Sequence, residues 1–436
     1  MDINPSQSSL ALAVLNGALT DGAAIVQASA STATSQRWLL KKSTSGAYNI
    51  VSVASGKSLT FADSNSGTQA TQSSDTASGL QRWFLNPVSG QCGGAVAHGF
   101  ANQSGADGLA TTTGGGSAAP VTVTSCSALT TALQSTAAAV VQIPANTTID
   151  CHTAPRTAMA CAVACGSNDP AKTYYRMPAG QTCTSLGSST DALFARSVND
   201  TRILVGSNKT LIGLDTNAKV LGATLELGAA KNVIIRNLTI EDINPGLVEA
   251  GDGIGMNGAS HIWIDHVTFN LISDGHVDMY NSKNVTLSWN NFKGQNPAVC
   301  GGQHYYTNLV ENSVVTFDHN YWQKTAGRNP KLDGAATRAH IYNNYWLDLT
   351  YFAINANSSA QAKVEGDYFA NTAKPHWNVS GLIDANISSN RYTGVSATDT
   401  YKNTGSTVFG DVTLYPYTLD AVDNLPGVLG NSAGAR

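Results

Sequence analysis

The chain has little charge and no long apolar run. Only 12% of its 436 residues are charged, and the formal net charge is -4. Such a chain gives no basis for a nucleic-acid partner, and no window approaches the roughly 20 apolar residues that a membrane span needs. Heptads and runs of like charge are also missing. We therefore expect neither nucleic acid nor a membrane as a partner, and we expect a monomer.

The amino terminus, MDINPSQSSL, also lacks the apolar segment of a signal peptide. Cysteine, in contrast, is clustered: six of the seven residues lie between Cys92 and Cys183, and Cys300 stands apart. Clustered cysteines among loops, without histidines at zinc-like spacing, favour disulfides in an oxidising compartment over a metal site. We interpret the chain as a secreted protein whose signal peptide has been removed. The odd count leaves at least one thiol unpaired, or joined to something outside this chain.

Residues 1–90 contain an internal repeat. A segment ending in Gln-Arg-Trp at Trp38 recurs about 45 residues later and ends at Trp83. The Q-x-W ending resembles the ricin B-type carbohydrate-binding module, a β-trefoil of three such units. Only two units are present, and the sugar-contacting Asp of that family has only a displaced counterpart, Asp63. We predict a small, incomplete trefoil-like module with both tryptophans in its core, and sugar binding is a secondary hypothesis.

A stretch rich in Gly, Ser, Thr and Ala begins near residue 91 and marks a boundary between domains 1–90 and 91–436. The next segment, VTVTS followed by ALTTALQSTAAAVVQIP, predicts a strand, a short helix and a strand. A helix with one apolar face is suited to cap the open end of a solenoid, whose edge strands would otherwise be exposed. The cysteine-rich segment 151–183 is expected to be a loop that depends on its disulfides, because it cannot bury a core of its own.

From Ile203 the chain settles into short alternating strands whose starts fall about 22 to 29 residues apart, the spacing of stacked coils. This pattern predicts an all-β fold, a right-handed parallel β-helix. An antiparallel sandwich is the alternative, and few tight Asn-Gly hairpin signals support it. Asparagine tolerates left-handed backbone geometry and can form hydrogen bonds along stacked turns, so a structural role is expected for its copies at strand ends. These copies are Asn237, Asn290, Asn291, Asn320, Asn343 and Asn344.

Three aspartates and one arginine recur at matching places in the coils: Asp252 in GDGI, Asp274 and Asp278 in DGHVD, and Arg328 in GRNPK. In an extended strand the last two aspartates would share a face but lie roughly 13 Å apart, at about 3.3 Å per residue. A common site therefore requires a bend at Gly275. Three converging carboxylates would repel one another without a cation, so we expect them to hold a hard metal ion.

The ordered set VGSNKTLIG, KNVIIRNLTI, GDGI, IWIDHVTF, DGHVD, VTLSWNNF, DHNYW, GRNPK and YNNYW resembles polysaccharide lyase family 1, the pectate and pectin lyases, over about residues 95–420. The resemblance implies an extracellular enzyme that cleaves polygalacturonate by calcium-assisted β-elimination to unsaturated oligogalacturonates. It implies that Ca²⁺ binds the three aspartates and that Arg328 is the base. Pectic polysaccharide would be the partner, with Lys331, Lys293 and His304 as substrate contacts.

Two departures from the family pattern leave the substrate open. Many pectate lyases place a lysine where this chain has Pro297, and a second arginine where it has Asp333. CGGQHYY before GRNPK looks more like pectin lyases, which act on methyl-esterified chains without calcium, although those enzymes place an Arg at the position of Asp274. The alternatives are thus a pectin lyase with little need for metal and a non-catalytic polysaccharide-binding protein. Asp265 and His266 in IWIDHVTF are expected to be a buried structural pair.

Overall fold

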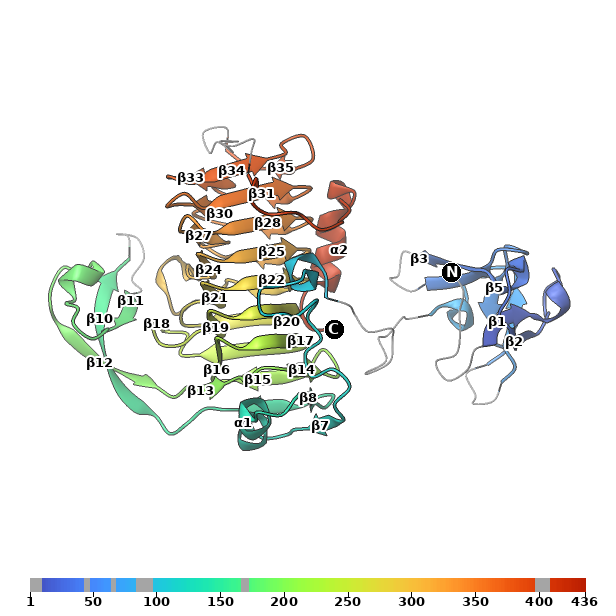
Figure 1. Cartoon of the computed structure of the whole chain (residues 1–436), viewed down its shortest axis with the longest axis horizontal. Coiled ribbons are helices and arrows are strands. Elements are labelled where there is room, and N and C mark those ends of the chain that lie inside the picture. Colours follow the sequence, from blue (N-terminus) through green and yellow to red (C-terminus); the bar gives the residue numbers. More distant parts are fainter. Residues whose placement is uncertain (1–9, 43–47, 64–67, 84–96, 166–171, 397–407) are drawn as a thin grey trace. The chain divides into compact units, whose positions relative to one another are not determined.

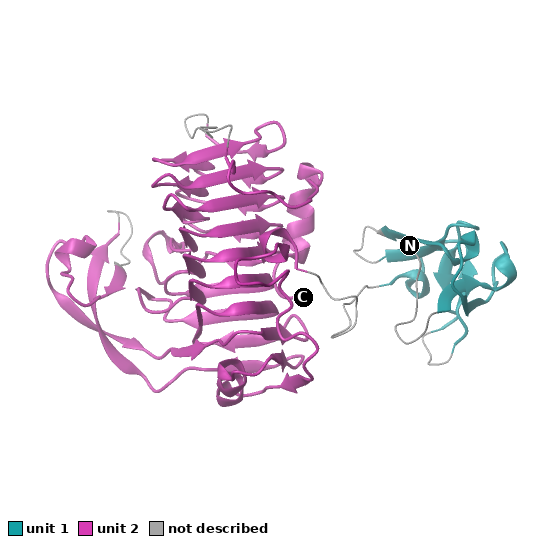
Figure 2. Ribbon diagram, in the orientation of Figure 1, with its two compact units in different colours: residues 1–95 teal, residues 96–436 magenta. Residues whose placement is uncertain are grey.

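The computed structural model describes residues 10–42, 48–63, 68–83, 97–165, 172–396 and 408–436. The chain divides into two compact units, Met1–Ala95 and Val96–Arg436, which Figure 2 distinguishes by colour. The boundary predicted near residue 90 lies outside the described residues, and so does Cys92. In the described part, no helix is both long enough and apolar enough to cross a membrane.

The first unit is built from short antiparallel strands. They are β1 (Leu10–Val14), β2 (Ile25–Ser29), β3 (Trp38–Lys42), β4 (Tyr48–Ser52), β5 (Ser58–Thr60) and β6 (Thr71–Ser73). The first two pair with each other, and the others form a sheet in chain order. Trp38 is fully buried in the apolar cluster of this unit, and Trp83 packs against the same cluster. The core role predicted for both tryptophans is confirmed.

The glutamine of each Gln-Arg-Trp ending has a structural task. Gln36 accepts a hydrogen bond from the Ser31 N–H (2.7 Å) and donates one to the Ser29 carbonyl (2.8 Å). In the second repeat, Gln81 makes the same pair of bonds, with the Thr76 N–H (2.8 Å) and the Ser74 carbonyl (2.9 Å). Both side chains are buried, so each one satisfies backbone groups of the turn that precedes its tryptophan.

The second unit is a right-handed parallel β-helix, as predicted (Figure 1). Among the described residues, one flank is a sheet of eight strands, ordered β13 (Thr201–Leu204), β16 (Ala223–Gly228), β19 (Ile254–Asn257), β21 (Val277–Tyr280), β24 (Asn308–Glu311), β27 (Lys331–Asp333), β30 (Ile354–Ala356) and β33 (His376–Asn378). All the strand pairings within the described part of this flank are parallel, and each strand belongs to a different coil.

The other faces of the coils belong to a second, larger parallel sheet. Its strands are β7 (Pro120–Thr122), β8 (Ala139–Ile143), β9 (Thr148–Asp150), β14 (Lys209–Gly213), β15 (Lys219–Leu221), β17 (Lys231–Ile243), β20 (Ser260–Ile272), β22 (Lys283–Ser288), β23 (Asn291–Lys293), β25 (Val314–Asp318), β26 (Tyr321–Gln323), β28 (Arg338–Tyr342), β29 (Tyr345–Leu347), β31 (Gln361–Glu365), β32 (Tyr368–Ala370), β34 (Leu382–Ala385) and β35 (Arg391–Thr393). Alternate side chains of both sheets point inward and form one continuous apolar core.

Two internal columns join successive coils. Inside the core, aromatic rings stack nearly parallel in an aromatic column made of Phe269, Phe292, Trp322, Trp346, Phe369 and Tyr392. At the strand ends, Asn290 donates from Nδ2 to Oδ1 of Asn320, and Asn320 donates in the same way to Asn344. The predicted hydrogen bonding of asparagines along stacked turns is thus confirmed. Asn237 and Asn343 adopt the predicted left-handed backbone conformation.

The helix expected to cap the solenoid is present as α1 (Cys126–Gln134), between β7 and β8. Its buried residues Leu129 and Leu133 belong to the main core, so the helix closes the end at which the solenoid begins (Figure 1). A disulfide from Cys126 to Cys151 ties it to the first coil. The second helix, α2 (Leu425–Ser432), packs on the outside of the later coils through its buried leucines.

The cysteine-rich segment is a folded excursion, and its interpretation as a loop is wrong. Strands β10 (Arg156–Ala164), β11 (Lys172–Arg176) and β12 (Leu193–Val198) form an antiparallel sheet that β18 (Leu247–Val248) extends. The excursion buries residues against Leu247 of the solenoid, so its small core is shared with the larger unit. That contribution comes from a distant part of the chain, which is why the segment alone gave no sign of a core.

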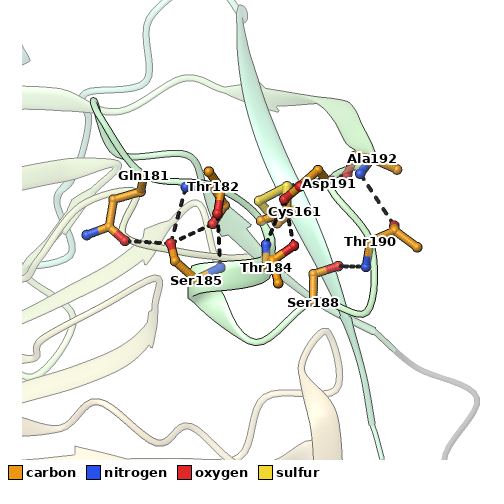
Figure 3. The surroundings of a disulfide bond; sticks show 10 residues. Cys161, Gln181, Thr182, Thr184, Ser185, Ser188, Thr190, Asp191 and Ala192 are labelled. Carbon is orange, nitrogen blue, oxygen red and sulfur yellow. Dashed lines mark hydrogen bonds between the residues drawn. A yellow bond between two sulfur atoms is a disulfide. The ribbon is translucent and has the colours of Figure 1, made fainter.

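Two disulfides hold the excursion. Cys161 pairs with Cys183, and beside this bond the turn in Figure 3 is closed by Asp191, which accepts hydrogen bonds from the Thr184 N–H (2.9 Å) and hydroxyl (2.8 Å). Cys165 pairs with Cys300 across 135 residues. Cys300, which stands apart in the sequence, is thus joined to the excursion by the fold.

Candidate active site

The three predicted aspartates lie together on the outer face of the eight-stranded flank. Asp252 precedes β19, while Asp274 precedes β21 and Asp278 lies within it. One carboxylate oxygen from each lies within 4.8 Å of the others. The chain bends between Ser273 and His276, as the sequence required. Gly275 is needed there for space, because a Cβ would lie 2.2 Å from the carboxyl carbon of Asp278.

The hydrogen bonds of the cluster leave one oxygen unsatisfied. Asp252 accepts from the Gly275 N–H (3.0 Å), and Asp278 accepts from the Leu309 N–H (2.9 Å). Oδ1 of Asp274 is buried and has no hydrogen-bond partner within the described residues. A buried carboxylate oxygen without a partner is costly, and a cation would satisfy it.

Burial and mutual repulsion raise the pKa of all three carboxyl groups. Burial is the larger cause in each case, and the charge of a neighbouring aspartate is the next. Glu249 raises the pKa values further, while Arg328 partly lowers those of Asp274 and Asp278. A set made only of oxygen ligands, crowded and short of positive charge, fits Ca²⁺ in its donor chemistry.

Arg328 lies beside this cluster, three residues before the first residue of β27. Its backbone is left-handed (φ 53°), and its carbonyl accepts a hydrogen bond from the Asn308 N–H (2.6 Å). The guanidinium lies over the ring of Tyr306, with 4.5 Å between Cζ and the ring centre. The fold thus brings the predicted base and the predicted metal ligands to one site, although they come from different coils.

His304 contacts the backbone that carries the aspartate cluster. It is buried, and its Nε2 donates to the backbone carbonyl of Asp274 (2.9 Å). Its ring stacks on His276 at 4.7 Å, and burial lowers the pKa of His304 to about 4, so the ring is neutral at pH 7. These contacts assign His304 to positioning Asp274, and the contact with substrate predicted for it stays a prediction.

The two predicted lysine contacts lie in different places. Lys331 is on β27, on the outer face of the flank that carries the aspartates, with Nζ 3.4 Å from Asp333. Lys293 ends β23 in the other sheet and lines a cavity of about 450 Å³ together with Pro297 and Lys324. Sequence reasoning missed Lys324, although it follows a strand that pairs with the strand of Lys293.

A second cavity, of about 370 Å³, opens beside the site and has tyrosine walls. Tyr305 and Tyr306 of the segment after β23 line it, and Tyr175 comes from the excursion. The hydroxyls of Tyr175 and Tyr306 lie 2.6 Å apart. With the Cys165–Cys300 disulfide, this contact makes the excursion a fixed wall of the cavity. Sequence reasoning missed this wall, because its tyrosines are far apart in the chain.

Asp265 and His266 lie away from this face, on β20 in the larger sheet. Asp265 is buried and accepts from Ser288 (2.8 Å), and its carboxylate lies 3.2 Å from Arg236 and 2.9 Å from His266. Its pKa is lowered by His266 and Arg236, despite the opposing effect of burial. The pair has the surroundings expected of a structural ion cluster.

Comparison with known protein families agrees with the resemblances seen in the sequence. Residues 177–425 match the family described as "Pectate lyase", which is more than half of the chain. The chain belongs to the pectate lyase family. Residues 2–74 and 34–122 match the family "Ricin-type beta-trefoil lectin domain-like"; the first match lies within the first unit, and the second extends past its end. Both family resemblances seen in the sequence are thereby confirmed.

Two curated relatives of this pectate lyase family member come from Aspergillus species. It is 34% identical over 306 residues to "Probable pectin lyase B" of Aspergillus fumigatus, a match that covers 66% of this chain and 78% of the relative. It is 40% identical over 178 residues to "Probable pectin lyase F-2" of Aspergillus terreus, over 39% of this chain and 37% of the relative. The chain thus spans less than half the length of the latter protein.

Solved structures support the fold. A pectate lyase from a Bacillus species, solved in complex with trigalacturonate, superimposes with a TM-score of 0.53 at 20% identity. The match covers 78% of this chain and 98% of that one. A pectate lyase from a Paenibacillus species gives a TM-score of 0.54 at 18% identity, over 78% and 96% of the two chains.

Proposed function

We propose that the protein is an extracellular pectate lyase that cleaves polygalacturonate by β-elimination. The observation that carries this proposal is the cluster of three carboxylates with a buried, unpartnered oxygen on Asp274. A site that holds a cation by carboxylates can receive a substrate whose sugars are themselves carboxylates. Three disulfides in the second unit support an extracellular location, since such bonds form and persist in oxidising compartments.

The proposed reaction removes the proton at C5 of a galacturonate residue and expels the sugar linked through O4. Calcium, held by Asp252, Asp274 and Asp278, would neutralise the carboxylate next to C5 and make its proton more acidic. Arg328 takes the C5 proton, and the C–H electron pair becomes the C4–C5 double bond. The C4–O4 bond breaks with its electron pair on O4, which takes a proton from water and leaves as the hydroxyl of the expelled sugar. The base role requires a guanidinium that gives up its own proton when substrate binds, because free arginine stays protonated.

The remaining residues of the site bind and orient. Lys331, partly exposed on the strand that follows Arg328, would bind a carboxylate of the polysaccharide. His304 holds the backbone of Asp274 and stays neutral, so it adds no charge to the site. Tyr306 lies under the Arg328 guanidinium and limits the directions from which substrate can approach that group.

A second candidate is cleavage of methyl-esterified pectin with little need for metal. The names of the curated relatives favour it, and so does the tyrosine-walled cavity beside Arg328, which suits a less charged substrate better than a carboxylate. In that reaction the ester already lacks the negative charge that a cation would neutralise.

One assay separates these candidates. Formation of the unsaturated product is followed by ultraviolet absorbance on polygalacturonate and on highly methylated pectin, each with calcium and with a chelator. Activity on polygalacturonate that chelation abolishes supports the proposal. Activity on methylated pectin alone that resists the chelator would support the second candidate. An absence of product from both substrates would indicate a non-catalytic binding protein.

A further inference from the structure

The outer face of the eight-stranded flank carries a straight line of residues that extends well beyond the aspartates. By strand register, Asp278 pairs with Leu309, which pairs with Lys331. Lys331 in turn pairs with Asn355, and Asn355 with Trp377. Parallel strands lie about 4.8 Å apart, so this outer column extends roughly 19 Å from Asp278 on β21 to Trp377 on β33.

The members of the outer column point away from the core. Their strand neighbours Met279, Leu332 and Ile354 are fully or almost fully buried inside it. Because successive side chains of a strand alternate between faces, the column lies on the outer face of the flank. Leu309 and Asn355 within it are themselves buried, at 8% and 3% exposed, whereas Lys331 and Trp377 are partly exposed. One straight face therefore carries a proposed metal ligand, a proposed substrate lysine and, at its far end, a tryptophan.

The far end of the outer column is an aromatic surface with a cation over it. The ring of Tyr351, which precedes β30 and is 38% exposed, lies 5.4 Å from that of Trp377. Nζ of Lys374 lies 4.6 Å from the first ring and 4.7 Å from the second. Lys374 forms no ion pair with any described residue, so its charge is free to meet an anion.

This surface is continuous with the site. The ring of Tyr305, in the wall of the tyrosine-lined cavity, lies 6.0 Å from that of Tyr351. Arg328 lies over Tyr306, whose ring is 4.8 Å from that of Tyr305. Aromatic rings thus extend without a break from the proposed base to Lys374, along the direction of the outer column.

We propose that Tyr351, Trp377 and Lys374 form a distal subsite for one uronate residue of the polysaccharide chain cleaved at Arg328. The apolar face of a sugar ring packs on aromatic side chains, and the uronate carboxylate meets the lysine. This proposal rests on the proposed function, because its occupant is another part of the same polyanion. The subsite serves long substrates, since a short oligosaccharide bound at the aspartates ends before it reaches Trp377.

The test uses Trp377→Ala and Lys374→Gln in the full chain. A matched control is Phe194→Ala: this ring on the excursion is 38% exposed, as the ring of Tyr351 is, and has a cation, Arg196, 5.7 Å away, but it lies off the outer column. We expect KM for polygalacturonate to rise roughly tenfold in each subsite variant. The ratio of kcat/KM on the polymer to that on trigalacturonate should fall by a similar factor, and Trp377→Phe should recover most of it.

The outcomes keep this proposal apart from the proposed function. An active enzyme whose polymer-to-trimer ratio is unchanged in Trp377→Ala and Lys374→Gln, or falls equally in Phe194→Ala, overturns the subsite. If the wild-type protein cleaves nothing, the proposed function fails, and affinity electrophoresis in gels that contain polygalacturonate decides about the subsite. Retardation of the wild type that is lost in Lys374→Gln supports it, and equal mobility of the two overturns it.

Discussion

Protons and calcium should compete for the aspartate cluster, and the pKa values set the range in which they do so. In the cation-free protein the pKa of Asp274 is raised to about 8 and that of Asp278 to about 7, so at pH 6 the pair holds about two protons. Calcium binds the ionised forms and must displace these protons. We therefore expect the apparent affinity for calcium to rise at least about 100-fold between pH 5 and pH 6, and the contribution of this pair to level off above about pH 9.

Calorimetry measures this competition directly. Calcium titrations in two buffers with different heats of ionisation give the number of protons released. Asp274 and Asp278 alone account for about two protons at pH 6, Asp252 adds to this number, and the contribution of the pair should fall to near zero at pH 9. Asp278→Asn should bind calcium weakly at every pH, while Asp384→Asn, on β34 of the larger sheet, serves as a control. Calcium binding that releases no protons at pH 6, or an absence of calcium binding at pH 9, would refute the reasoning.

The same cluster sets a pH dependence of stability. The folded protein favours the protonated acids, so their contribution to stability is present below the unfolded pKa, near 4, and is lost as the pH rises through 7 and 8. The melting temperature with excess calcium minus that with chelator should therefore be larger at pH 9 than at pH 5. An equal difference at both pH values would contradict this assignment.

Three further predictions concern single parts of the second unit. Arg328→Lys should lower kcat on polygalacturonate by about 10²- to 10⁴-fold with KM little changed, and near-normal turnover would remove the base assignment. Asn320→Ala leaves buried groups of its neighbours unsatisfied and should lower the free energy of unfolding in urea by about 3–5 kcal/mol. The control Asn291→Ala, at a position outside these hydrogen bonds, should lower it far less. Replacing Cys165 and Cys300 by serine should speed proteolysis within residues 156–198, while unchanged cleavage would show that other contacts fix the excursion.

Local periodicity was enough to predict the solenoid. The alternation of strands, the repeat of coils and the apolar-faced helix at residues 126–134 are all visible in short windows of sequence. The grouping of Asp252 with Asp274 and Asp278 was also predictable, since their places in successive coils match and only a bend at Gly275 had to be assumed.

The excursion could not be predicted in the same way, because its contacts join distant parts of the chain. Its core needs Leu247, and its link to the cavity needs Cys300, which pairs with Cys165 across 135 residues. The tyrosine wall has the same origin. Lys293 is the cation nearest to Pro297 in the sequence, but the fold places it with Lys324 in a separate cavity.

The aromatic column within the core bears on how a cleft of this kind can diversify. Phe292 and Trp322 are register partners on neighbouring strands, although the chain between them includes the whole tyrosine-bearing segment of the cavity wall. Trp346 and Phe369 are partners in the same way with a much shorter connection. Each ring returns to the same line whatever the length of the intervening segment. Loops on the cleft side can therefore lengthen, shorten or change sequence over evolution while the scaffold beneath them stays the same.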